Sequence, residues 1–186
     1  MRLSKDKNKM KGTGMRTAKE CALLAVLVSA LIAAQLVLSA VPGVEAVTVL
    51  FVSYAFAAGW KRASFAATAF SLLRQIVFGV FPVVLVLYLI YYNLLALAFG
   101  LLGEKVREPK RSLWLIVLCA CLSTACFTLL DNVLTPLWYG YSARAIKLYL
   151  LASLPVMISQ IVCAALSVSL LFLPLFGVFK RFFPKN

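Results

Sequence analysis

The sequence predicts an all-α, polytopic membrane protein: a bundle of six transmembrane helices with both termini in the cytoplasm. Of its 186 residues 63% are hydrophobic, and the mean hydropathy is +0.98, whereas a soluble domain is only about half apolar. Apolar runs close to the ~20 residues that a membrane crossing needs alternate with short polar segments. Lys and Arg gather in every second polar segment, which indicates a fixed orientation.

Prolines, glycines and charged pairs mark the ends of the expected helices. Pro42 and Gly43 break the first apolar run, and Lys61 and Arg62 follow the second. The expected helices span residues 21–41, 46–59, 63–78, 82–102, 112–134 and 146–178. The second and third are short for a crossing. The last is too long for one straight crossing, so we expect an interfacial first turn or a bend at Pro155.

The charge distribution sets the expected topology in the plasma membrane. A basic arm, residues 1–20, precedes the membrane domain, residues 21–179, and a tail, residues 180–186, ends the chain. With the N-terminus inside, 16 Lys and Arg lie on the inner side, and only Arg144 and Lys147 lie on the outer side. This positive-inside pattern explains the net charge of +13 better than a nucleic-acid partner does.

The residue types argue against chemistry within this chain. There is no His, which removes the commonest general base and metal ligand. The five Cys lie in apolar runs without metal or redox spacing, and no phosphate-binding glycine loop is present. We therefore expect no catalytic set, metal or cofactor, and expect any energy source to be a gradient or another subunit.

Two ionisable residues, Arg74 and Asp131, interrupt apolar runs. Each costs at least about 2.5 kcal/mol at the centre of a membrane helix. In the expected topology Arg74 and Asp131 lie in the outer parts of their helices, and Glu45 lies at an outer turn. Two interpretations remain open: an ion pair that fixes two helices, or a solute pocket open to the outside. In such a pocket Arg74 would suit a carboxylate, a phosphate or a carbonyl.

Aromatic and amide residues extend the candidate site. Tyr88, Tyr91 and Tyr92 share one helix face. They serve as an aromatic belt, as packing, or as a stacking wall for a ring-containing solute. Trp138 suits either a belt or a gate. The candidate binding residues are Glu45, Arg74, Gln75, Tyr88, Tyr92, Asn93, Asp131, Asn132, Trp138 and Gln160.

The first helix carries small residues at intervals of four, which allow close approach of helices in lipid. These lines serve internal packing or contact with a partner. Their members are Ala25, Ser29 and Ala33 on one line, and Ala22, Ala30 and Ala34 beside it.

Four strings carry a resemblance to a known family: AAQLVLSAVPGVEAVTVLFVSYAFAAGWKRA, FGVFP, LYLIYYNLLALAFG and LLDNVLTPLWYGYS. With the six helices, the basic arm and the small-residue first helix, the chain resembles the substrate-binding S component of energy-coupling factor transporters. The resemblance implies capture of a small vitamin-like solute in an outer pocket beneath a lid of outer loops. It implies a transmembrane T component and two ATP-binding-cassette ATPases as partners, and no enzymatic activity of the chain itself. It also implies that Ala30 and Ala34, or Ala25 and Ser29 in a shifted register, contact the T component.

Two other function classes stay open at this point. A membrane-embedded enzyme or assembly factor is disfavoured by the missing His and metal ligands. A stand-alone secondary transporter or channel is disfavoured because we find no clearly broken helices at matching positions of two halves.

Overall fold

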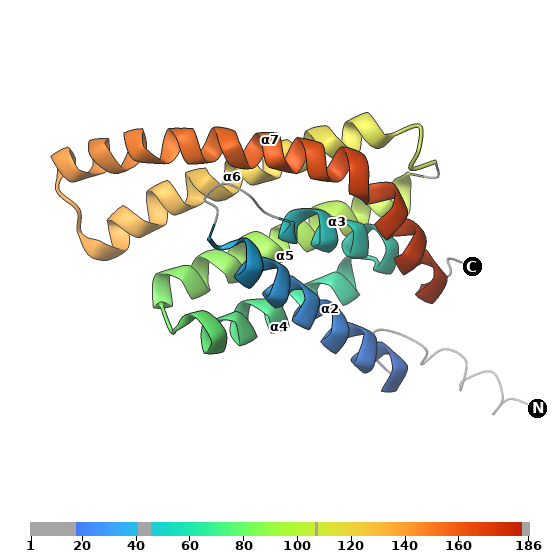
Figure 1. Cartoon of the computed structure of the whole chain (residues 1–186). Helices are drawn as coiled ribbons and strands as arrows, with labels where there is room; N and C mark the ends of the chain where they lie inside the picture. Colours follow the sequence, from blue (N-terminus) through green and yellow to red (C-terminus); the bar gives the residue numbers. More distant parts are fainter. Residues whose placement is uncertain (1–17, 41–45, 107, 184–186) are drawn as a thin grey trace, which may run out of the picture.

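The structure is a computed structural model that describes residues 18–40, 46–106 and 108–183, apart from the side chain of residue 19. In this part of the chain every regular element is a helix. The helices are α2 (Ala18–Leu38), α3 (Val47–Ala58), α4 (Trp60–Phe78), α5 (Pro82–Lys105), α6 (Leu113–Tyr139) and α7 (Ala143–Phe182). The expected all-α class is confirmed, and Figure 1 shows the arrangement of the helices.

Four helices are long and apolar enough to cross a membrane: α2 from Glu20, α5, α6 and α7. Their outward surfaces are strongly apolar, as on α6, where Leu118, Leu122 and Val133 are exposed. A contiguous apolar surface of this extent is unusual on a soluble monomer. The chain therefore has the character of a membrane protein.

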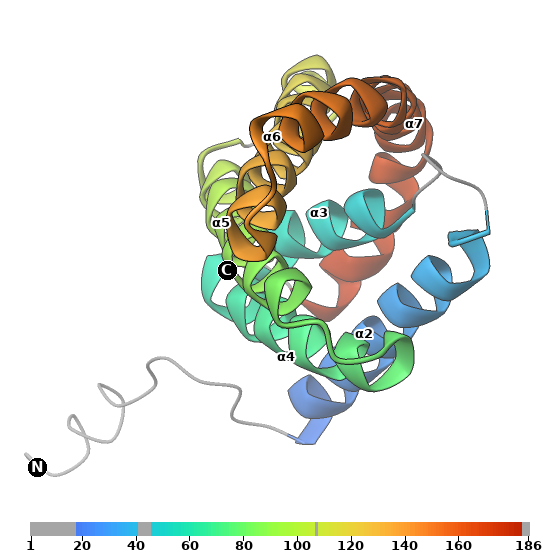
Figure 2. The ribbon, with the colours of Figure 1, turned by 90° about the vertical axis from the view of Figure 1, so that its left-hand side faces the viewer.

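Helix α3 is too short to span a bilayer core, since its 12 residues extend only about 18 Å. Eleven of those residues are buried, and α3 contacts each of the other five helices. Figure 2, which looks along the bundle, shows α3 inside a ring of longer helices. An all-round apolar helix needs such an enclosed position, so protein rather than lipid surrounds α3.

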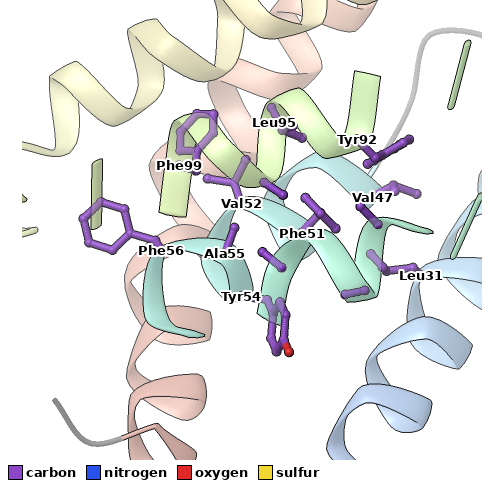
Figure 3. Packing of buried hydrophobic residues seen from close by; sticks show 14 of the residues in the cluster. Leu31, Val47, Phe51, Val52, Tyr54, Ala55, Phe56, Tyr92, Leu95 and Phe99 are labelled. Atoms are coloured by element: carbon purple, nitrogen blue, oxygen red, sulfur yellow. The ribbon is translucent and has the colours of Figure 1, made fainter. Parts of the chain in front are cut away.

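Aromatic side chains fix α3 within that ring. Phe51 meets the ring of Tyr92 on α5 edge to face, with centroids 5.3 Å apart. At the other end of α3, Phe56 meets Phe172 and Phe176 on α7 in the same way, at 5.3 and 5.4 Å. Figure 3 shows this core from close by. The core therefore links α5 and α7 through α3, although these two helices have no direct packing contact.

The α3–α4 corner packs against two glycines of α5. Gly59 joins α3 to α4 with φ of 85°, a conformation that glycine adopts without strain. A Cβ on Gly100 would lie 2.3 Å from the backbone of Trp60, and one on Gly103 would lie 2.3 Å from the carbonyl oxygen of Phe56. The backbones therefore touch where Gly100 and Gly103 lie.

Helix α7 begins earlier and bends later than the sequence predicts. Ser142 caps its N-terminus, and the Ser142 Oγ accepts a hydrogen bond from the backbone N–H of Ala145. The helix continues through Pro155, and its last third turns away from the direction of the rest (Figure 1). Pro174 lies in that last third, and a proline removes one helical hydrogen bond and crowds the carbonyl four residues before it.

The two ends of the bundle differ in charge. At the basic end, where α2, α4 and α6 begin and α5 and α7 finish, Arg62 forms an ion pair with Glu20 at 2.8 Å. The Arg62 guanidinium also lies 5.3 Å from the ring of Phe183. The opposite end, where α2, α4 and α6 finish and α5 and α7 begin, is called the far end below.

Candidate functional site: a half-buried arginine at the far end of the bundle

Arg74 lies in the last part of α4 and turns towards α2 and α5. Its guanidinium carbon is 4.3 Å from the ring centroid of Tyr88 and 4.8 Å from that of Phe78. Its Nε donates a hydrogen bond of 3.1 Å to Oε1 of Gln35 on α2. Its Nη1 is buried and has no partner among the described residues. The contacts of Arg74 described here are thus with neutral groups, and one of its N–H donors remains unused.

Gln35 completes the support of Arg74. Besides accepting from Arg74, Gln35 donates through Nε2 to the hydroxyl of Tyr88 at 2.7 Å. One amide therefore joins α2 to α4 and α5, and the main packing of α2 is on α3 and α4. Gln35 is not among the binding residues expected from the sequence, although a lone amide in an apolar helix is the same kind of signal that indicated Gln160.

Gln75, the next residue on α4, is only 5% exposed. Its Oε1 accepts a hydrogen bond of 3.1 Å from the backbone N–H of Phe81, in the turn between α4 and α5. Its Nε2 is buried without a partner among the described residues. Gln75 therefore anchors the α4–α5 turn with one atom, and its amide nitrogen remains an unused donor.

Arg74 and Asp131 do not form the ion pair that the sequence left open. The oxygens of Asp131 instead accept hydrogen bonds from Thr135 at 2.7 Å and from Tyr149 at 2.6 Å. Neither Arg74 nor Asp131 is in an ion pair with a described residue. The ion-pair interpretation is wrong because each side chain finds nearer neutral partners, Arg74 on α2 and α5 and Asp131 on α6 and α7.

Asn132 and Gln160 lie on a separate polar seam between α6 and α7. Thr128 donates to Oε1 of Gln160 at 3.1 Å, and Asn132 donates through Nδ2 to Ser153 at 2.8 Å. Oδ1 of Asn132 is buried without a partner among the described residues. These bonds join the two helices, as polar pairs do in membrane bundles, and do not bring Asn132 or Gln160 to Arg74.

The tyrosines of α5 belong to a mutual aromatic cluster. Tyr88 and Tyr92 are 5.3 Å apart, and Tyr88 lies 5.8 Å from Phe127 of α6. Tyr91 lies 4.8 Å from Phe127. The tyrosines are buried against other rings, which favours packing for most of the cluster. Tyr88 is the member that reaches Arg74.

The remaining candidates lie elsewhere or outside the described residues. Asn93 donates to the carbonyl of Leu89 at 2.9 Å and to Thr68 at 3.4 Å, away from Arg74. The side chain of Trp138 is 55% exposed. Glu45 lies outside the described residues.

The small residues of α2 lie on its outward side. The side chains of Ala22, Ala25, Ser29, Ala30 and Ala33 are exposed, whereas that of Ala34 is half-buried. Within the described structure these small residues are thus largely unused in packing the bundle. They leave a shallow surface on which a second helix can approach closely.

A hollow of about 280 Å³ lies at the basic end, away from Arg74. Phe56, Gly103 and Phe176 form part of its wall, and Glu104 and Lys180 add charges. No group of His, Cys, Asp and Glu in the described residues has the arrangement of a metal site.

Comparison of the chain with family models, with curated proteins and with solved structures finds no match.

Proposed function

We propose that this chain is the solute-capturing S component of an energy-coupling factor importer in the plasma membrane. It would bind a small vitamin-like solute at the outer, far end of a bundle that crosses the membrane six times, with both termini in the cytoplasm. The observation that carries the proposal is Arg74: a membrane-level arginine with aromatic walls, a fixed orientation and an unused donor. Such a residue is costly in a membrane protein and usually serves function.

The charge distribution supports this orientation. Sixteen Lys and Arg would lie on the cytoplasmic side and two on the outer side, a strong bias for short connections. The short α3 is compatible with six crossings because other helices surround it. Backbone that is enclosed by protein need not span the lipid by itself.

The exposed small residues of α2 support a helical partner. Ala25, Ser29 and Ala33 form one outward line, where close helix approach is possible. In the proposal this surface contacts the T component, and the two ATPases supply the energy through that component. The chain itself then needs no catalytic residue.

Ligand screening followed by uptake tests the proposal. Purified protein is screened by thermal shift against vitamins and nucleobase-like compounds, because a ligand that binds the folded state raises the melting temperature. The compound found is then used for uptake by cells that express the chain with its partners. We expect Arg74→Ala to abolish uptake at normal expression. Unchanged uptake in Arg74→Ala would show that the pocket is misplaced.

A further inference from the structure

Two donors from consecutive residues of α4, Nη1 of Arg74 and Nε2 of Gln75, are buried and lack an acceptor among the described residues. Both atoms donate and do not accept. A buried donor without a partner costs about 1–3 kcal/mol, so such a group indicates an acceptor that the described chain does not supply. The missing group at this place therefore accepts hydrogen bonds.

The charge of Arg74 also lacks a counter-charge among the described residues. Its neighbours are the amide oxygen of Gln35 and the rings of Phe78 and Tyr88, which are all neutral. Asp131 is engaged with Thr135 and Tyr149. The other described acidic residues, Glu20, Glu104 and Glu108, lie at the basic end. The missing acceptor should therefore carry a negative charge.

We infer that the solute carries one carboxylate, whose oxygens accept from Arg74 and Gln75. The inference rests on the proposed function, because it names the class of solute for the same site. A planar carboxylate matches the donor geometry of a guanidinium and neutralises its single charge. A neutral carbonyl would leave the arginine charge unbalanced. A phosphate dianion carries two negative charges, and Arg74 balances only one of them. Arg144 and Lys147, which could supply a second positive charge near this end, are exposed side chains at the start of α7.

Four probes of similar shape and different charge test this inference on the full chain in lipid nanodiscs. The probes are benzoate, benzamide, benzylammonium and phenyl phosphate, measured by saturation-transfer NMR and titration at constant ionic strength. We expect benzoate to bind at least tenfold more tightly than each of the others. The inference is overturned if benzoate does not bind up to its solubility limit, or if benzamide or phenyl phosphate binds equally well.

Matched variants assign the selectivity to the two donors. Arg74→Gln removes the charge, and Gln75→Met removes the donor without adding a charge, together with the acceptor for Phe81; each should weaken benzoate binding about tenfold or more. Arg62→Gln removes an arginine at the basic end, where its partner is Glu20, and should leave the preference intact. Unchanged selectivity in Arg74→Gln would overturn the inference.

Glu45, which lies outside the described residues, is an alternative source of the carboxylate within the chain itself. If Glu45 paired with Arg74, benzoate would bind to the Glu45→Gln variant and not to the natural chain, and the inference would be wrong. Equal benzoate binding in both supports it. Failure of the proposed function is distinguishable, because absent uptake despite benzoate selectivity would reject transport while leaving the carboxylate site in place.

Discussion

Gln35 accepts a hydrogen bond of 3.1 Å from Arg74 and thereby fixes a guanidinium that interrupts an apolar run of the sequence. The same Gln35 amide donates to Tyr88. The contact joins α2, which has few neighbours, to the helix pair α4 and α5. The position of α2 and the orientation of Arg74 therefore depend on one another.

Replacement of Gln35 by Glu should separate stability from binding. The new carboxylate would accept from Arg74 and supply the missing counter-charge, so we expect the melting temperature to stay equal or rise. Benzoate binding should fall about tenfold or more, because the added charge competes for the same guanidinium. Thermal unfolding and the benzoate titration measure the two effects. Lower stability together with unchanged benzoate binding would contradict this coupling.

The contact between α5 and the α3–α4 corner makes Gly100 sensitive to added volume. Gly100→Ala places a methyl group 2.3 Å from the backbone of Trp60, and we expect a loss of about 1–3 kcal/mol in stability. Gly177→Ala on α7 is the matched control, since a Cβ there meets nothing within 4 Å. That change should stabilise the helix by up to about 1 kcal/mol. Equal melting temperatures of the two variants would show that the close approach is absent.

The hydrogen bond between Thr128 and Gln160 should contribute measurably to the α6–α7 contact. In a double-mutant cycle with Thr128→Val and Gln160→Leu, we expect a coupling energy of about 0.6 kcal/mol, and at most about 1.7 kcal/mol. Ser123→Ala is a control, because its hydroxyl bonds to the carbonyl of Cys119 within α6. A coupling near zero would mean that the two side chains do not pair in the membrane.

The proposed orientation predicts which turns face the outside. In a variant without native cysteines, Ser142→Cys in the α6–α7 turn should react with a membrane-impermeant maleimide added to intact cells. Ser112→Cys, just before α6, should react only after the cells are permeabilised. The reverse pattern would place the basic end outside. Labelling of both cysteines in intact cells would show that α6, which lies between them, does not cross the membrane.

Hydropathy, proline and glycine positions predict the number and order of the helices, because the local pattern decides where an apolar helix ends. The local pattern does not decide where α7 bends, because the helix contains two prolines. The packing of α7 on α3 and α6 decides between them. The charges of Arg74 and Asp131 are evident in the sequence, whereas their partners are not. Gln35 and Tyr149 come from other helices, and only the packing of the helices brings them near.

If this chain captures solute for an ATP-driven importer, as proposed, then it is bound to its partner subunits in the native membrane. Tagged protein is purified from mild detergent extracts of native membranes, and the associated proteins are identified and counted. We predict one T component and two ATP-binding-cassette ATPases for each chain. These partners should be retained in Ala34→Leu. They should be lost when Ala25 and Ser29, on the exposed side of α2, are both replaced by Leu. Purification of the natural chain without these ATPases, from cells that contain them, would contradict the account.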